Sequence, residues 1–257
     1  MCGVFGFIAS GKGGRFDVDR MEAIALDTQT RGRHAHGLAW IDSRNRLRAY
    51  KSAGAIGDNL GVIDLAGDAR MLIGHCRWAT NGDPSENINN HPHPCDGGWL
   101  VHNGIVFNHE PLRWEWELQP TSQCDSEIIA QLIETLDGTL LARAVGAVEQ
   151  LEGPAVVVGL WARPARMLVV RRGKPLHVEY DSSGNVYFAS LPCALNDPDR
   201  LRDNTARLFL FSGWTLYHTI QEILPCRKRV PERNPPLCRP VRYYVLPAST
   251  DSPRPAI

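Results

Sequence analysis

Short stretches in which apolar and small side chains alternate dominate the first part of the chain, and this period of two predicts β-strands. Residues 2–9 begin the series directly after the initiator methionine. Residues 46–54 and 71–80 continue it, with a glycine-rich connection between them. Residues 98–108 predict a strand that is interrupted at Asn103-Gly104, a pair typical of turns and bulges.

Apolar residues recur at helical spacing in three segments, 17–30, 126–136 and 140–151. The second of these is preceded by side chains that can cap a helix, namely Thr121, Ser122 and Asp125. Short apolar runs at hairpin spacing then return between residues 155 and 190.

Two groups of strands with helices between them predict two packed sheets flanked by helical layers, and the pattern alone is compatible with either α+β or α/β. From Pro225 onward proline is frequent and the helical period is lost. We therefore expect residues 225–257 to be a proline-rich extended arm or tail, and residues 2–224 to be the folded part.

The charge balance narrows the class of partner. Lys+Arg and Asp+Glu each number 28, so the formal net charge is zero, which gives no electrostatic basis for binding nucleic acid or an anionic membrane. No apolar run approaches the roughly 20 residues that span a bilayer, and the N-terminus lacks a secretion signal. The seven cysteines are odd in number and scattered, unlike a disulfide framework. We expect a reduced, cytoplasmic protein.

Cys2 is a candidate nucleophile because of its position. Removal of Met1 would place its thiol beside its own α-amino group. An unperturbed α-amine titrates at about 7.7–8.0 and a thiol at about 8.5, so the amine is suited to accept the thiol proton near neutral pH. The alternative is that Cys2 is simply a small apolar residue of a strand.

Other polar residues add candidate chemistry. Arg77 ends a predicted strand and opens a loop rich in Gly, Asn, Asp and Pro, where its guanidinium could grip a carboxylate. Asn103 supplies an amide beside the backbone N–H of Gly104, and two such donors can form an oxyanion hole. Asp125 could bind a substrate ammonium, or it could cap the helix that follows.

Five segments in this order resemble the glutaminase domain of class II glutamine amidotransferases, and most strongly that of glucosamine-6-phosphate synthase. They are MCGVFG, RGRHAHGLAW, GHCRWATNGDPSENINNHPH, VHNGIVFNHEPL and TSQCDSEIIAQLI. The resemblance implies an α+β fold over residues 2–224, a four-layer α/β/β/α N-terminal-nucleophile hydrolase sandwich of two antiparallel sheets. It also implies hydrolysis of L-glutamine to glutamate and ammonia through a γ-glutamyl thioester, with no cofactor and no metal.

The resemblance also assigns roles by position. Cys2 matches the nucleophile, with its α-amine as the base. Asn103 and Gly104 match the oxyanion donors. Glutamine would be bound by one loop and one acidic residue: Arg77, Trp78, Ala79, Thr80 and Asp125.

The chain departs from the family pattern at three points. The family usually reads Arg-Gly-x-Asp-Ser-Ser/Ala-Gly where residues 31–37 read RGRHAHG, so two imidazoles appear and the acidic residue is gone. Residues 80–82 read TNG in place of the synthase's Thr-His-Gly. The sugar-phosphate isomerase domains of the synthase have no counterpart in these 257 residues, so we expect a separate acceptor synthetase subunit to receive the ammonia.

Four other interpretations remain open. A metal could bind at HPHPC, residues 91–95, although its spacing is not that of a usual zinc site. A papain-like cysteine enzyme would need a nucleophile at a helix N-terminus, which Cys76, Cys95 and Cys124 do not offer. A non-catalytic glutamine-binding regulatory module and a hydrolase of another γ-glutamyl amide would each use the same binding residues.

Overall fold

The structure, a computed structural model, describes residues 1–11, 14–193, 195–212 and 215–222. The predicted arm at 225–257 lies outside the described residues, so the proposed boundary near residue 224 stays a prediction. Within the described part of the chain, no helix is both long and apolar enough to cross a membrane.

The first sheet has seven antiparallel strands in the order β11-β9-β10-β1-β4-β2-β3. Its strands are β1 (Gly3–Ile8), β2 (Ala35–Asp42), β3 (Leu47–Ala53), β4 (Ala69–Arg77), β9 (His177–Tyr180), β10 (Val186–Ala189) and β11 (Asp199–Arg200). The second sheet has six antiparallel strands in the order β13-β12-β8-β7-β6-β5. Its strands are β5 (His93–Cys95), β6 (Gly98–Gly104), β7 (Ala155–Ala162), β8 (Ala165–Arg172), β12 (Thr205–Ser212) and β13 (Thr215–Glu222).

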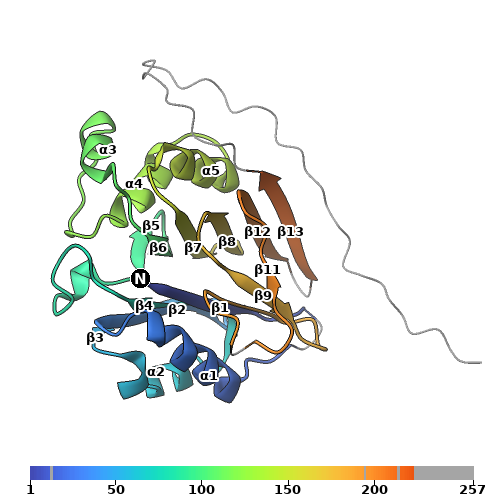
Figure 1. Cartoon of the computed structure of the whole chain (residues 1–257). Coiled ribbons are helices and arrows are strands. Elements are labelled where there is room, and N and C mark those ends of the chain that lie inside the picture. The colour runs from blue at the N-terminus through green and yellow to red at the C-terminus, as the bar shows by residue number, and fades with distance from the viewer. Residues whose placement is uncertain (12–13, 194, 213–214, 223–257) are drawn as a thin grey trace, which may run out of the picture.

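Helices cover the outer face of each sheet (Figure 1). The α-helices are α1 (Val18–Thr28), α2 (Gly61–Asp64), α3 (His109–Glu115), α4 (Glu127–Thr135) and α5 (Leu140–Gln150). The short 3-10 turns are η1 (Gln29–Arg31), η2 (Ile56–Asp58) and η3 (Asn87–Asn89). Helices α1 and α2 lie against the first sheet, whereas α4 and α5 lie against the second (Figure 1). The predicted four-layer sandwich is therefore confirmed.

The alternation within β1 explains how the layers are held together. Phe5 and Phe7 point to the outer face and join the core beneath α1. Val4 and Ile8 point to the opposite face and join the core between the two sheets. All four side chains are fully buried. Because successive strand residues face opposite sides, one strand contributes to two cores, and this fixes the position of the chain's N-terminus.

The helices at the predicted positions 17–30, 126–136 and 140–151 are confirmed as α1, α4 and α5. The strand predicted over residues 98–108 breaks off at the Asn103-Gly104 pair, since β6 ends at Gly104, but residues 105–108 do not resume it. The capping of α4 also differs from the prediction. The residue before this helix makes no side-chain cap, and the Glu127 carboxylate instead accepts the N–H groups of Thr121 and Ser122, at 2.9 and 2.7 Å.

Asp42 at the end of β2 anchors the hairpin to β3. Its Oδ1 accepts the backbone N–H groups of Arg44 and Arg46, each at 2.9 Å, and its Oδ2 accepts Arg46 Nε at 2.7 Å. Burial raises the pKa of the carboxyl group, but these hydrogen bonds and a longer one from Arg48 outweigh burial and lower the pKa to about 2.

Asp42→Asn is expected to lower the free energy of unfolding by about 2 kcal/mol at pH 7, because a carboxylate pKa below its unfolded value near 3.9 stabilises the fold. This stabilisation is complete above the unfolded pKa and is lost as pH falls through about 2. Urea unfolding at pH 7 and pH 3 should therefore show a smaller difference between mutant and wild type at pH 3. The exposed Asp64→Asn variant is the control, and an equal loss at both pH values would contradict the assignment.

Candidate active site

The strand register places Cys2 beside the end of β4. Gly3 in β1 pairs with Cys76 in β4, so the residue before Gly3 lies next to Arg77 and Trp78. Cys2 Sγ lies 3.4 Å from both the backbone nitrogen and the carbonyl oxygen of Trp78. The thiol therefore lies at the start of the loop that the sequence predicts to bind substrate.

A second segment fixes the backbone of the candidate nucleophile. Arg31 Nε donates to the carbonyl oxygen of Cys2 at 2.8 Å. Gly32 lies so close to the neighbouring peptide that an added Cβ would be 2.4 Å from the carbonyl carbon of Arg77 and 2.5 Å from Trp78 N. A side chain at residue 32 would push this turn away from Cys2. Arg31 is a positioning residue that the assignment of roles by sequence missed, although the Arg-Gly pair was visible.

The Cys2 thiol lies between charges of opposite sign. Burial raises its pKa above the ordinary value, and the hydrogen bond from Trp78 N–H, the α-amino group of Met1 and the Arg77 guanidinium partly lower the pKa again. The Asp125 carboxylate acts in the opposite direction and raises the pKa. A thiol whose pKa is raised is protonated at neutral pH, so it needs a base before it can act as a nucleophile.

His34 stands where the family pattern has its acidic residue. Its Nδ1 accepts the backbone N–H of Ala79 at 3.0 Å, and its ring stacks on Trp78 with the centroids 4.5 Å apart. A carboxylate at this position could accept the same N–H. The His34 imidazole therefore replaces the hydrogen-bond acceptor that the missing acidic residue would provide. The Ala79 N–H is consequently engaged within the protein.

Arg77 is buried and holds the loop that follows it. Its Nη1 donates to Asn90 Oδ1 at 2.8 Å, and its Nη2 donates to the carbonyls of Asn81 and Gly82. A guanidinium has five N–H donors, so these three acceptors do not use its full capacity. Trp78 is 50% exposed, and Thr80 is exposed too, so the loop around the buried arginine remains open to solvent.

The end of β6 brings the second sheet to the same region. His75 Nε2 in β4 is 3.0 Å from the carbonyl oxygen of His102 in β6, a contact that joins the two sheets. The next residue, Asn103, is 1% exposed, yet its Nδ2 has no hydrogen-bond partner. A buried donor without an acceptor costs about 1–3 kcal/mol. Such a donor is what an oxyanion hole keeps available for its substrate.

Asp125 is tied to the segment that follows the candidate oxyanion donors. Its Oδ2 accepts the backbone N–H of Val106 at 2.7 Å, two residues after Gly104. The alternative that Asp125 caps the following helix does not hold, since its Oδ2 accepts an N–H of this distant loop and α4 has no side-chain cap. Asp125 is buried, and its charge acts on Cys2. The carboxylate thus connects the oxyanion segment with the nucleophile.

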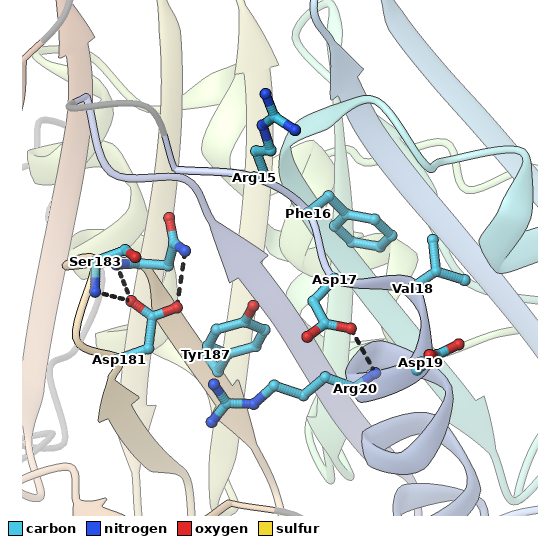
Figure 2. A pocket seen from close by; sticks show the side chains of 10 residues that line it. Arg15, Phe16, Asp17, Val18, Asp19, Arg20, Asp181, Ser183 and Tyr187 are labelled. Carbon is cyan, nitrogen blue, oxygen red and sulfur yellow. Dashed lines mark hydrogen bonds between the residues drawn. The ribbon is translucent and has the colours of Figure 1, made fainter.

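A surface pocket of about 550 Å³ lies elsewhere, at the opposite end of β1 from Cys2. Figure 2 shows Asp17, Arg20, Asp181 and Tyr187 among its lining residues. Asp17 accepts the Arg20 N–H at 3.0 Å, and Asp181 accepts the Ser183 N–H at 2.9 Å. These carboxylates cap a helix and close a turn, and the pocket lining includes no cysteine or histidine.

The candidate site combines a cysteine directly before β1 with groups from both sheets, as expected from the resemblance to N-terminal-nucleophile hydrolases. A family model described as a glutamine amidotransferase domain matches residues 83–197. Residues 83–197 therefore belong to a glutamine amidotransferase domain.

Similar proteins extend this assignment. Glutamine–fructose-6-phosphate aminotransferase (isomerizing) of Vibrio vulnificus YJ016 is 34% identical over 206 residues, which are 76% of this chain and 32% of that protein. The enzyme of the same name from Yersinia pestis is 35% identical over 189 residues, which are 68% of this chain and 29% of that protein. The chain thus spans about a third of the length of these curated relatives.

Solved structures support the fold. The glutamine phosphoribosylpyrophosphate amidotransferase of B. subtilis, complexed with ADP and GMP, is similar with a TM-score of 0.66 at 22% identity, over 84% of this chain and 48% of that one. A glutamine aminotransferase class-II domain protein from Silicibacter pomeroyi is similar with a TM-score of 0.55 at 14% identity, over 87% of this chain and all of that one.

Proposed function

We propose that this domain hydrolyses L-glutamine to glutamate and ammonia, with Cys2 as the nucleophile. The observation that carries the proposal is the position of the Cys2 thiol, 3.4 Å from the backbone of Trp78, the residue directly after Arg77. The charges of the Arg77 guanidinium and the Asp125 carboxylate both act on this thiol. An α-amino acid carries one carboxylate and one ammonium group, so a cation and an anion beside one nucleophile suit such a substrate.

Removal of Met1 completes the site in this proposal. Met1 is 66% exposed, and the new α-amine of Cys2 takes the thiol proton as Sγ attacks the side-chain amide carbon. Asn103 Nδ2 and the Gly104 N–H stabilise the resulting oxyanion. The tetrahedral intermediate collapses with transfer of the proton to nitrogen, which leaves as ammonia. Water then cleaves the γ-glutamyl thioester and releases glutamate.

The released ammonia passes, in this proposal, to an acceptor enzyme on a separate subunit. The relatives of similar sequence are aminotransferases whose names include glutamine and fructose 6-phosphate. Affinity purification of the tagged chain from its own cells should recover a synthetase-like partner that increases glutaminase turnover. Full activity of the purified chain with no recovered partner would contradict a separate acceptor.

The activity itself is tested by measuring glutamate released from L-glutamine and from its γ-methylamide, and aspartate released from L-asparagine. The proposal predicts turnover of L-glutamine and none of asparagine, whose shorter side chain cannot reach Cys2 when its α-groups are bound. Preference for the methylamide would favour hydrolysis of another γ-glutamyl amide. Glutamine binding without turnover, after confirmed loss of Met1 and with the acceptor present, would favour a regulatory module.

His34→Ala is expected to raise the KM for glutamine about 3- to 10-fold, which corresponds to loss of one hydrogen bond of about 0.5–1.5 kcal/mol. The reason is that His34 Nδ1 holds the Ala79 N–H, and its ring supports Trp78. His34→Asp supplies another acceptor and is the matched control, with KM closer to that of wild type. Steady-state kinetics on both variants measure the effect, and an unchanged KM in His34→Ala would contradict a loop-positioning role.

A further inference from the structure

A cluster of buried imidazoles and one thiol lies beneath the candidate active site. His91, His93 and Cys124 each have a possible ligand atom, and these atoms all lie within 4.8 Å of one another. His91 and His93 are at most 2% exposed, and Cys124 is 5% exposed. Among the described residues, this is the group of three or more such side chains that has the geometry of a metal site.

The imidazoles of this cluster lack hydrogen-bond partners. Both ring nitrogens of His91 and Nε2 of His93 are buried and unpaired. The two rings meet edge to face with their centroids 4.6 Å apart, and the His75 ring lies tilted against that of His91 with the centroids 3.9 Å apart. Buried polar atoms are normally paired, so three unpaired imidazole nitrogens in one cluster indicate a group that they would bind.

The structure changes which cysteine belongs with the two histidines. The sequence HPHPC suggests Cys95, but Cys95 Sγ contacts the carbonyl oxygen of Ala130 in α4, at 3.6 Å. Cys124 is distant in sequence and comes to the cluster because it lies in the loop before α4. Its Sγ is also 3.9 Å from Asp125 Oδ1. The cluster therefore lies directly next to a residue that we propose to bind substrate.

We propose that His91, His93 and Cys124 bind a d10 transition-metal ion of the Zn²⁺ type. Two imidazoles and one thiolate are ligands that suit zinc, and three protein ligands leave a fourth position for water. Binding converts the Cys124 thiol to a thiolate and releases its proton to solvent. The thiolate and the neighbouring Asp125 carboxylate offset the charge of the ion and that of Lys51, whose Nζ is bound to the carbonyls of Asn90 and Pro92.

Metal binding requires a small contraction of the cluster. Zinc–nitrogen and zinc–sulfur distances of about 2.0–2.1 and 2.3 Å place tetrahedral ligand atoms about 3.3–3.7 Å apart. The present atoms lie within 4.8 Å of one another, so rotations of the side chains by about 1 Å at the ligand atoms suffice. Because Asp125 follows Cys124 directly, the metal would hold the loop that carries this substrate-binding carboxylate.

The test is Co²⁺ titration of the metal-free full chain in a Cys2→Ser background, followed by competition with Zn²⁺ and elemental analysis. The background removes the accessible active-site thiol as a source of signal. We expect a thiolate-to-cobalt charge-transfer band and the visible bands of tetrahedral Co²⁺, both lost on addition of Zn²⁺. Cys124→Ser should remove the charge-transfer band and weaken binding at least about 100-fold, whereas the matched buried control Cys95→Ser should retain both.

His93→Gln provides an independent variant if circular dichroism shows that Cys124→Ser does not fold, and it should weaken Co²⁺ binding to a similar extent. Absence of any charge-transfer band at excess Co²⁺ in the folded Cys2→Ser protein would overturn the proposal. Loss of the band in Cys95→Ser with retention in Cys124→Ser would overturn the ligand set. These outcomes do not depend on glutamine hydrolysis, so they leave the proposed function to its own tests.

Discussion

Cys2→Ala is expected to lower the rate of glutamine hydrolysis by at least about 10⁴-fold, because the variant has no atom with which to form the thioester. Binding should survive, since the groups that we propose to hold the substrate belong to Arg77 and Asp125. The measurement is glutamate release, combined with calorimetric titration of glutamine. Retained affinity with lost turnover would separate the role of the thiol from any effect on folding.

The exposed cysteine Cys193 provides the control for this prediction. Cys193→Ser should keep wild-type turnover, because residue 193 lies outside the site. Turnover in Cys2→Ala within tenfold of wild type would show that another group performs the reaction. Equal losses in both variants would indicate that the assay responds to general damage to the protein.

Asn103→Ala is expected to lower kcat by about 10²- to 10³-fold with little change in KM, the effect of removing one oxyanion donor. The structural reason is that Nδ2 of this buried asparagine has no partner in the protein. Because the substitution breaks no hydrogen bond of Nδ2, the free energy of unfolding should not fall by the usual cost of a lost hydrogen bond. Kinetics and urea unfolding on one preparation measure both quantities.

Asn185 is the matched control for Asn103. It is also buried, but both polar atoms of its amide are hydrogen-bonded, with Oδ1 accepting Ser10 N–H and Nδ2 donating to Asp181 Oδ2, each at 2.8 Å. Asn185→Ala should therefore lose about 1–3 kcal/mol of stability and keep its kcat. If Asn103→Ala instead lost stability and kept its kcat, the oxyanion assignment would be wrong.

The layers of the fold follow from periodicity, because the residues that alternate in β1 divide between two cores and the apolar faces of α1, α4 and α5 each repeat at helical spacing. The strand beyond the Asn-Gly pair was mispredicted, because residues 105–107 are apolar like a strand although β6 ends at Gly104. The sequence could not predict which residues from distant parts of the chain lie next to one another in the site. Cys124 and His91, or Arg31 and Cys2, are brought together only by the pairing of strands and the packing of loops.

Some site residues were predictable because their chemistry is specific. Cys2 was identified by its place in the chain, Arg77 by its position at the end of a predicted strand, and Asn103 by its amide beside the N–H of Gly104. His34 was identified only as a departure from a pattern, since its role depends on the Ala79 N–H that lies opposite it in space. The hydrogen bonds from Arg77 to loop carbonyls could likewise not be predicted, because every residue has a backbone carbonyl and the sequence does not show which ones accept.

The most direct test of the central claim is the intact mass of the purified protein before and after incubation with 6-diazo-5-oxo-norleucine, with peptide mapping of the product. The account predicts that Met1 is absent and that one inhibitor-derived group is attached to the residue 2 thiol, with attachment prevented by excess glutamine. A protein that has lost Met1 and folds normally, yet gains no adduct or gains it on another residue, would contradict Cys2 as the nucleophile.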